Sequence, residues 1–163
     1  MAMFRLDPWA KAARCDDAAF REVELADFDP FAARDESVAV IIGNDADLVA
    51  MTEILRARLR SVDAVILQFP DFRDGRAYSQ ARLLRQRIGF EGDIIARGDV
   101  LRDQALLMAR CGFTIVETDR SCAADLAESL LEFSAFYQRA SDGQEPVWSL
   151  RHERSAQSGR AAA

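Results

Sequence analysis

Residues 63–117 read DAVILQFPDFRDGRAYSQARLLRQRIGFEGDIIARGDVLRDQALLMARCGFTIVE. Three nearly continuous apolar runs lie in this stretch, at residues 63–69, 93–97 and 113–117. Such runs are typical of strands buried on both faces of a parallel sheet. The residues between the runs have the spacing of amphipathic helices, at 77–88 and 100–110. The stretch therefore predicts that strands and helices alternate.

The same alternation continues on both sides of this stretch. VAVII at 38–42 predicts another buried strand, and the helical spacing that follows it runs over 47–59, with Asp45 or Asp47 as the N-cap. A long helix is predicted over 122–140. The result is four βα units, and right-handed crossovers between them would give a parallel sheet.

Two sheet geometries fit these units. The uniform repeats favour a curved sheet resembling half of a (βα) barrel, and the alternative is a small doubly wound, flavodoxin-like sheet. A half-barrel exposes two strand edges, so we expect the chain to form a homo-dimer. We divide the chain into an N-terminal extension (1–36), a single α/β domain (37–140) and a polar C-terminal tail (141–163).

Composition excludes several classes of function. The net charge of -6 and the sequence pI near 4.9 argue against nucleic acid as a partner. No apolar run approaches the roughly 18 residues that would span a membrane, and the first residues lack the apolar core of a secretory signal. We therefore expect a cytoplasmic location.

Few residues could support metal or redox chemistry. The one histidine, His152, lies in the polar tail, which argues against a Ser-His-Asp triad and most zinc sites. The three cysteines form no CxxC pair, and Cys111 is interpreted as a buried, unreactive thiol. GNDAD at 43–47 matches neither GxGxxG nor a P-loop. No metal or cofactor is evident, and a flavin has no motif to support it.

Positive charge is concentrated in the middle of the acidic chain. Residues 54–112 hold 11 arginines and 7 acidic residues. The carboxyl ends of parallel strands form one rim, where ligands usually bind. We expect the loops there to bind a small oxyanion, because guanidinium forks and helix N-termini both favour anions. The predicted anion-binding residues are Arg73, Arg76, Ser79, Arg97 and Gly98.

The residues leave alternatives to this prediction open. Arg73 and Arg76 could instead pair with Asp71 and Asp74 to order their own loop. Arg82, Arg85 and Arg87 are interpreted as a solvated helix face.

Three residues are candidates for catalysis on the same rim. Asp99 and Asp103 share a helix face and could transfer protons, and Tyr78 opens the helix after the arginine-rich loop. The alternative role of the two carboxylates is a helix cap with ion pairs to Arg102.

Three long motifs carry a resemblance to a known family. FPDFRDGRAYSQARLLRQRIGF, GDVLRDQALLMARCGF and LEFSAFYQ resemble a bacterial domain-of-unknown-function family whose members are described as oxidoreductases of sulfite reduction. The resemblance runs from about Val38 to Trp148, and it departs from the family at Ala77, where glycine is usual.

The resemblance implies a role in sulfur metabolism, because the family accompanies genes of assimilatory sulfate reduction, including the sulfite reductase haemoprotein. It implies an accessory protein of sulfate and sulfite reduction that binds a small oxyanion such as sulfite or sulfate, or docks onto sulfite reductase. The alternative is a small oxidoreductase or other enzyme that acts on a sulfur-containing or phosphorylated substrate. The family implies no catalytic residues.

Overall fold

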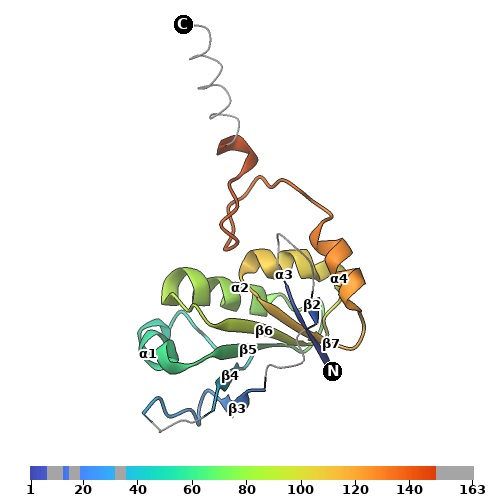
Figure 1. The fold of residues 1–163 in the computed structure, drawn as a ribbon. Helices are drawn as coiled ribbons and strands as arrows, with labels where there is room; N and C mark the ends of the chain where they lie inside the picture. The colour runs from blue at the N-terminus through green and yellow to red at the C-terminus, as the bar shows by residue number, and fades with distance from the viewer. Residues whose placement is uncertain (7–12, 15–18, 32–35, 150–163) are drawn as a thin grey trace, which may run out of the picture.

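The computed structural model describes residues 1–6, 13–14, 19–31 and 36–149. These residues form one seven-stranded sheet with helices packed against it (Figure 1). The strands are β1 (Ala2–Arg5), β2 (Ala13–Arg14), β3 (Arg21–Glu24), β4 (Val38–Ile42), β5 (Ala64–Phe69), β6 (Asp93–Gly98) and β7 (Ile115–Thr118). The helices are α1 (Thr52–Arg58), α2 (Arg76–Leu83), α3 (Ala105–Cys111) and α4 (Ala123–Leu130). The prediction of an α/β fold is confirmed.

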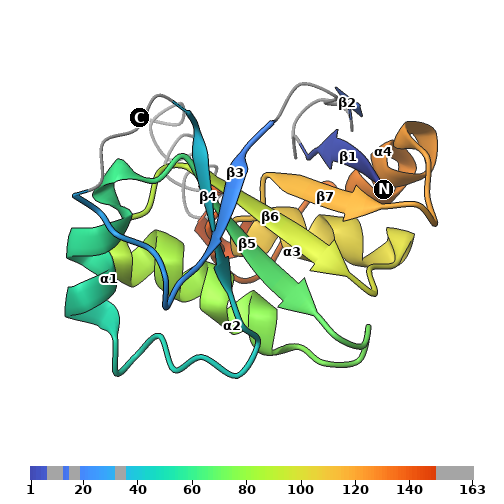
Figure 2. The ribbon, with the colours of Figure 1, turned by 90° about the horizontal axis from the view of Figure 1, so that it is seen from below.

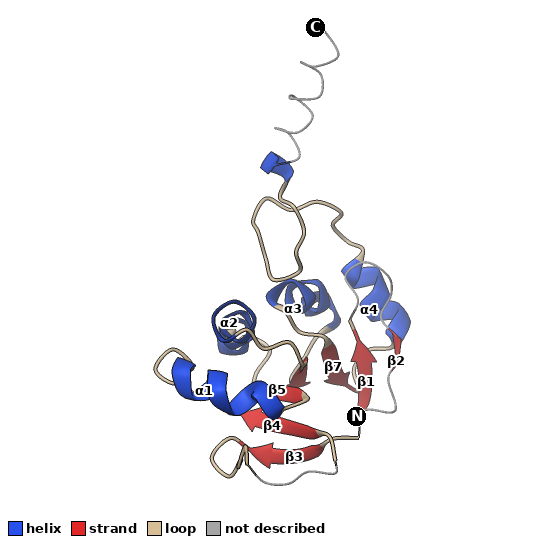
Figure 3. Cartoon of the chain, turned by 60° about the vertical axis from the view of Figure 1, so that its left-hand side comes forward, coloured by secondary structure: helices blue, strands red, loops and turns tan. Residues whose placement is uncertain are grey.

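The spatial order of the strands is β2-β1-β7-β6-β5-β4-β3. Strands β3 to β7 are parallel and follow one another in chain order, whereas β1 pairs antiparallel with β7 and β2 pairs antiparallel with β1. Because the chain order never reverses among the parallel strands, the sheet differs from the flavodoxin-like alternative. Figure 3 shows α1, α2, α3 and α4 on one face of the sheet.

The N-terminal 36 residues supply strands that the sequence did not predict. β1 and β3 extend the two sides of the sheet that the apolar runs predicted. Both are four residues long, and the exposed side chains of β3 are charged. Such segments become strands because a neighbour offers free backbone groups, which no local pattern reveals.

Helix bounds differ from the sequence predictions at several ends. The segment expected to be helical from 47 begins its regular helix at Thr52. In the turn before it, the Asp47 carboxylate accepts the N–H groups of Val49 and Ala50, which is the arrangement expected of the predicted N-cap. The helix after β5 ends in a π-helical turn, η2 (Leu84–Ile88), and α3 follows a 3₁₀ turn, η3 (Arg102–Gln104).

The prediction of a long helix over 122–140 is wrong beyond Leu130. There α4 ends, and residues 131–149 continue without a long helix or strand. They return towards α3, where Ser141 N–H donates to the Arg110 carbonyl at 2.9 Å. Helices are stabilised mainly by packing of an apolar face, and residues 131–149 instead make contacts with Arg110 on α3.

Both faces of the sheet are apolar. The helix-facing side holds the larger core, which includes Leu67, Phe69 and Phe113. The opposite face holds a smaller cluster of buried residues, formed by Ala39, Ala64, Ile66, Ile95 and Ile115. This burial on both faces explains why the central strands are continuous apolar runs in the sequence.

Candidate functional site

The predicted rim exists as a set of connected loops. Figure 2 shows β5, β6 and β7 ending at the same edge of the sheet. The Asn44 side-chain amide donates to Asp74 at 2.8 Å, joining the loops after β4 and β5. Phe72 joins the loops after β5 and β6, since its N–H donates to Asp99 at 3.2 Å and its carbonyl accepts from Gln104 at 2.8 Å. The rim is therefore an ordered surface.

The two arginines of the loop after β5 each grip an aspartate two residues earlier. Arg73 donates from Nε and Nη2 to Asp71, at 2.9 and 2.8 Å, and Arg76 donates from the same atoms to Asp74, at 3.0 and 2.7 Å. The hydrogen bonds from Arg76 lower the pKa of Asp74 to about 2. The arginine side chains are 76% and 60% exposed, so an oxyanion here would compete with these aspartates.

Arg97 lies on the face of the sheet opposite the helices, as does Ile95, because side chains alternate along β6. Its Nε donates to Glu117 at 2.5 Å, and its two terminal nitrogens donate to Glu22 at 2.7 and 2.6 Å. Hydrogen bonding to Glu22 and Glu117 raises the pKa of Arg97. The structure does not bring Arg97 together with the arginines of the loop.

Gly98 and Asp99 shape the loop after β6. Gly98 has φ +117°, and a Cβ built on it would lie 2.3 Å from the Phe69 carbonyl oxygen. The backbone of β5 therefore requires glycine here, whatever binds at the rim. Asp99 accepts a hydrogen bond from Arg120 as well as from the Phe72 N–H.

The remaining candidates differ in burial, and the pKa of Tyr78 is raised mainly by burial, to which the charge of Asp103 adds. Asp103 is exposed in the η3 turn. Ser79 is exposed on α2. Tyr78 points into the core, with its ring 5.2 Å from that of Phe69 and 6.2 Å from that of Phe113. Its hydroxyl has no hydrogen-bond partner among the described residues, and burial raises its pKa.

The rim combines its positive charges with at least as many negative ones. Each of its arginines, in the part of the chain that the structure describes, has a carboxylate partner; for Arg120 this partner is Asp99, and for Arg102 it is Glu128 at 3.5 Å. Sequence reasoning missed Arg120, which follows the predicted rim loop after β7, and Glu22, whose partner lies three strands away. The arginine-rich stretch therefore does not make the rim a positively charged surface.

Comparison with known proteins places these loops in a family. A family model described as bacterial protein of unknown function, DUF934, matches residues 39–148. The chain belongs to the DUF934 family. The match begins in β4 and includes the rim and residues 131–148, in agreement with the extent of the resemblance found from the motifs. No curated protein and no solved structure matches the chain.

Two further observations limit what the described part of this DUF934 chain contains. None of its helices has the length and apolar character that crossing a membrane requires. No cluster of three histidine, cysteine, aspartate or glutamate side chains able to hold a metal occurs within residues 1–6, 13–14, 19–31 and 36–149. Cys111 is buried, as predicted, and burial raises the pKa of its thiol, whereas Cys122 is exposed.

Proposed function

We propose that the protein is an accessory protein of assimilatory sulfate and sulfite reduction that docks onto sulfite reductase. The pathway comes from the motif resemblance. The docking mode is supported by one observation above all: four large apolar side chains are exposed between residues 131 and 148. They are Leu131, Phe133, Tyr137 and Trp148, which are 65%, 59%, 76% and 41% exposed.

The segment that carries these side chains is anchored to the body by Arg110 on α3. The Arg110 guanidinium donates to the Gln138 carbonyl at 2.7 Å, pairs with Asp142 at 3.1 Å and lies 3.6 Å from the centre of the Phe136 ring. Figure 1 shows the segment beyond α3, on the side away from the sheet. The exposed side chains therefore project from an anchored segment, a suitable arrangement for recognising a partner.

The residue types also favour a protein partner. Aromatic side chains bury a large area at little cost in conformational entropy, and they dominate binding energy at protein interfaces. Exposed apolar groups that are concentrated in one segment are unusual unless they meet another surface. The family match extends to residue 148, so it includes this segment together with the domain.

Binding of a small oxyanion is a second arm of the proposal. It is supported by the exposure of Arg73 and Arg76, because solvent screens exposed ion pairs and makes them weak. Sulfite or sulfate would have to displace Asp71 and Asp74 from the guanidiniums. The neutralised rim makes docking the better supported of the two arms.

A half-barrel-like curvature of the sheet is also part of the proposal. Glu22 is level with Asp93 in the register, through Ala39 and Ala64, and Arg97 lies four residues further along β6. In a flat sheet these positions would be about 19 Å apart, whereas extended Arg and Glu side chains span roughly 15 Å. Their hydrogen bonds at 2.7 and 2.6 Å support a sheet that coils towards this face.

A homo-dimer is also expected, and residues 131–148 are a better candidate for its interface than the edges of the sheet. One edge strand, β2, has two residues, and the other, β3, carries Arg21, Glu22 and Glu24. Short, charged edges disfavour pairing with another sheet. Self-association through residues 131–148 would therefore compete with docking onto the reductase.

Growth on defined sulfur sources tests the proposed pathway. A strain that lacks the gene is expected to grow on cysteine but not on sulfate or sulfite, because the missing step lies at or after sulfite. Reintroducing the wild-type gene should restore growth on both. Growth of the deletion strain on sulfite at the parental rate would contradict the role. Purified protein with flavin absorbance and turnover of a sulfur compound would favour the enzyme alternative.

A further inference from the structure

A cavity of about 350 Å³ opens at the end of the sheet opposite the rim. It lies between the α1 side, where the 3₁₀ turn η1 (Leu59–Ser61) follows the helix, and residues 88–92, which lead into β6. We call it the basal cavity. Its apolar lining comes from Leu59, Val62, Ile88 and Phe90, each less than a tenth exposed. A volume of this size suits a small organic ligand.

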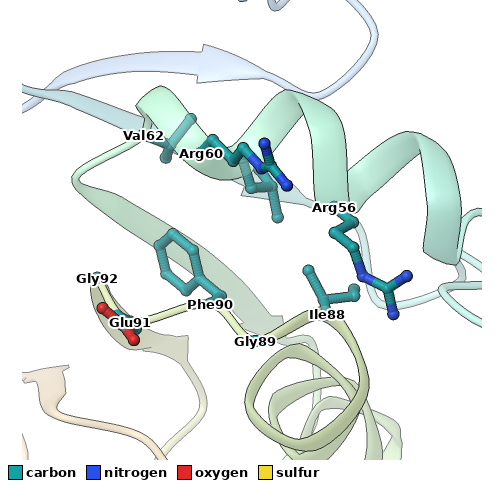
Figure 4. A pocket seen from close by; sticks show the side chains of 9 residues that line it. Arg56, Arg60, Val62, Ile88, Gly89, Phe90, Glu91 and Gly92 are labelled. Atoms are coloured by element: carbon teal, nitrogen blue, oxygen red, sulfur yellow. The ribbon is translucent and has the colours of Figure 1, made fainter.

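The two arginines of the basal cavity differ in whether other groups of the protein already bind them. Figure 4 shows Arg56 and Arg60 together on the α1 side and Glu91 at the other end. Arg56 donates to Glu53 at 2.9 Å and to the Arg87 carbonyl at 2.7 Å. The Arg60 guanidinium is exposed and bonds to none of the described residues. This arginine therefore has all its hydrogen-bond donors available to a ligand.

A neighbouring hollow adds a further cation. It has a volume of about 440 Å³, shares Arg56 with the basal cavity and is lined by Arg87. The Arg87 side chain is exposed, and it too bonds to nothing in the described part of the chain. Two uncompensated arginines of the arginine-rich stretch, Arg60 and Arg87, thus lie at this end, whereas every rim arginine among the described residues has a carboxylate partner.

One wall of the basal cavity is held firmly. Arg85 donates from Nη1 to the carbonyls of Phe90 and Gly92, at 2.7 and 2.8 Å, and from Nε to that of Gly112 at 3.0 Å. A Cβ on Gly92 would lie 2.4 Å from the Asp63 carbonyl oxygen, so the turn fits closely against the start of β5. A preorganised wall lowers the entropic cost of binding.

We propose that the basal cavity binds a small organic anion, with an anionic head group on Arg60 and Arg56 and an apolar body against Phe90 and Ile88. The head group is a carboxylate, phosphate or sulfo group, since a guanidinium grips each of these with paired hydrogen bonds. The protein has a net charge of -6, so non-specific attraction of anions is weak and binding depends on these local cations. The site is independent of the proposed docking surface.

Calorimetric titration with phenyl phosphate tests the proposal. Phenyl phosphate should bind at least about ten-fold more tightly than inorganic phosphate, which lacks the apolar body, or benzyl alcohol, which lacks the charge. Arg60→Gln should weaken phenyl phosphate binding about ten-fold, the effect of one lost charge-assisted contact. Glu91→Gln should strengthen it by a few-fold, because a negative charge that lines the cavity is removed.

Arg82→Gln is the matched control, since Arg82 is also exposed, bonds to no described residue and lies outside the basal cavity. It should leave binding unchanged. Equal weakening by the two arginine variants would indicate general electrostatic attraction and overturn the site. Absence of phenyl phosphate binding to the wild-type protein would also overturn the proposal. So would unchanged binding in Arg60→Gln, and a lowered melting temperature of that variant would then show that Arg60 only stabilises the end of its helix.

Discussion

Replacing Gly98 with alanine is expected to lower the free energy of unfolding by about 3 kcal/mol or more. The added Cβ would lie 2.3 Å from the Phe69 carbonyl oxygen and 3.0 Å from its carbonyl carbon. Gly98 also has φ +117°, a region that alanine rarely adopts. The contact is with the backbone at the end of β5, so no side chain can rotate away to relieve it. Chemical denaturation measures the loss.

Gly89→Ala is the control for this prediction. Gly89 also has a positive φ, +75°, but a Cβ built there meets nothing within 4 Å. This substitution should lower the free energy of unfolding by about 1–2 kcal/mol, which is the cost of the left-handed conformation alone. Equal losses of unfolding free energy in the two variants would contradict the prediction, because they would show that the structure relieves the contact with Phe69. Glycine at position 98 would then be better explained by close approach of a ligand.

Replacing Arg85 with methionine is expected to destabilise the fold by about 3 kcal/mol, because three partly buried carbonyl groups lose their donor. These carbonyls belong to Phe90, Gly92 and Gly112, so Arg85 joins the end of η2 to the start of β6 and the end of α3. Burial lowers the pKa of Arg85, as expected for a cation whose main partners are backbone carbonyls. Methionine keeps the apolar stem and removes the guanidinium.

Arg82→Met provides the comparison. Arg82 lies one turn earlier on the same helix, is exposed and has no hydrogen-bond partner in the described chain. Its replacement should change stability by less than about 0.5 kcal/mol. Thermal unfolding of the two variants side by side distinguishes a structural arginine from a solvated one. A stability loss of under 1 kcal/mol in Arg85→Met would contradict the assigned role.

The core strands were predictable because burial on both faces leaves a continuous apolar run. The run at 38–42 coincides with β4, and the one at 63–69 begins a single residue before β5. β3 was not predictable, since its sequence REVE is charged and its pairing with β4 depends on tertiary structure. The early end of α4 depends likewise on where residues 131–149 find a surface.

The site was less predictable than the fold. A count of charged residues along the chain adds together arginines that lie at opposite ends of the strands. Residues 54–112 cross the sheet repeatedly, so their arginines divide between the rim and the base. The sequence allowed Arg73 and Arg76 either an anion or the aspartates nearby, and the structure pairs them with the aspartates. The interpretation of Arg85 as solvated was wrong, since its three backbone acceptors come together only in the folded chain.

The docking proposal is tested most directly by titrating the protein into purified sulfite reductase haemoprotein and measuring the heat of binding. We predict a complex with a dissociation constant in the micromolar range or below, weakened about 30-fold or more by the double variant Phe133→Ser and Tyr137→Ser. The double variant Val49→Ser and Ile54→Ser removes side chains of similar exposure, 53% and 55%, from α1 and the turn before it, and should bind like wild type. Figure 1 shows α1 at the far end of the helix layer from α4. No heat of binding by the wild-type protein, or equal affinity of wild type and the Phe133 and Tyr137 variant, would contradict the docking function.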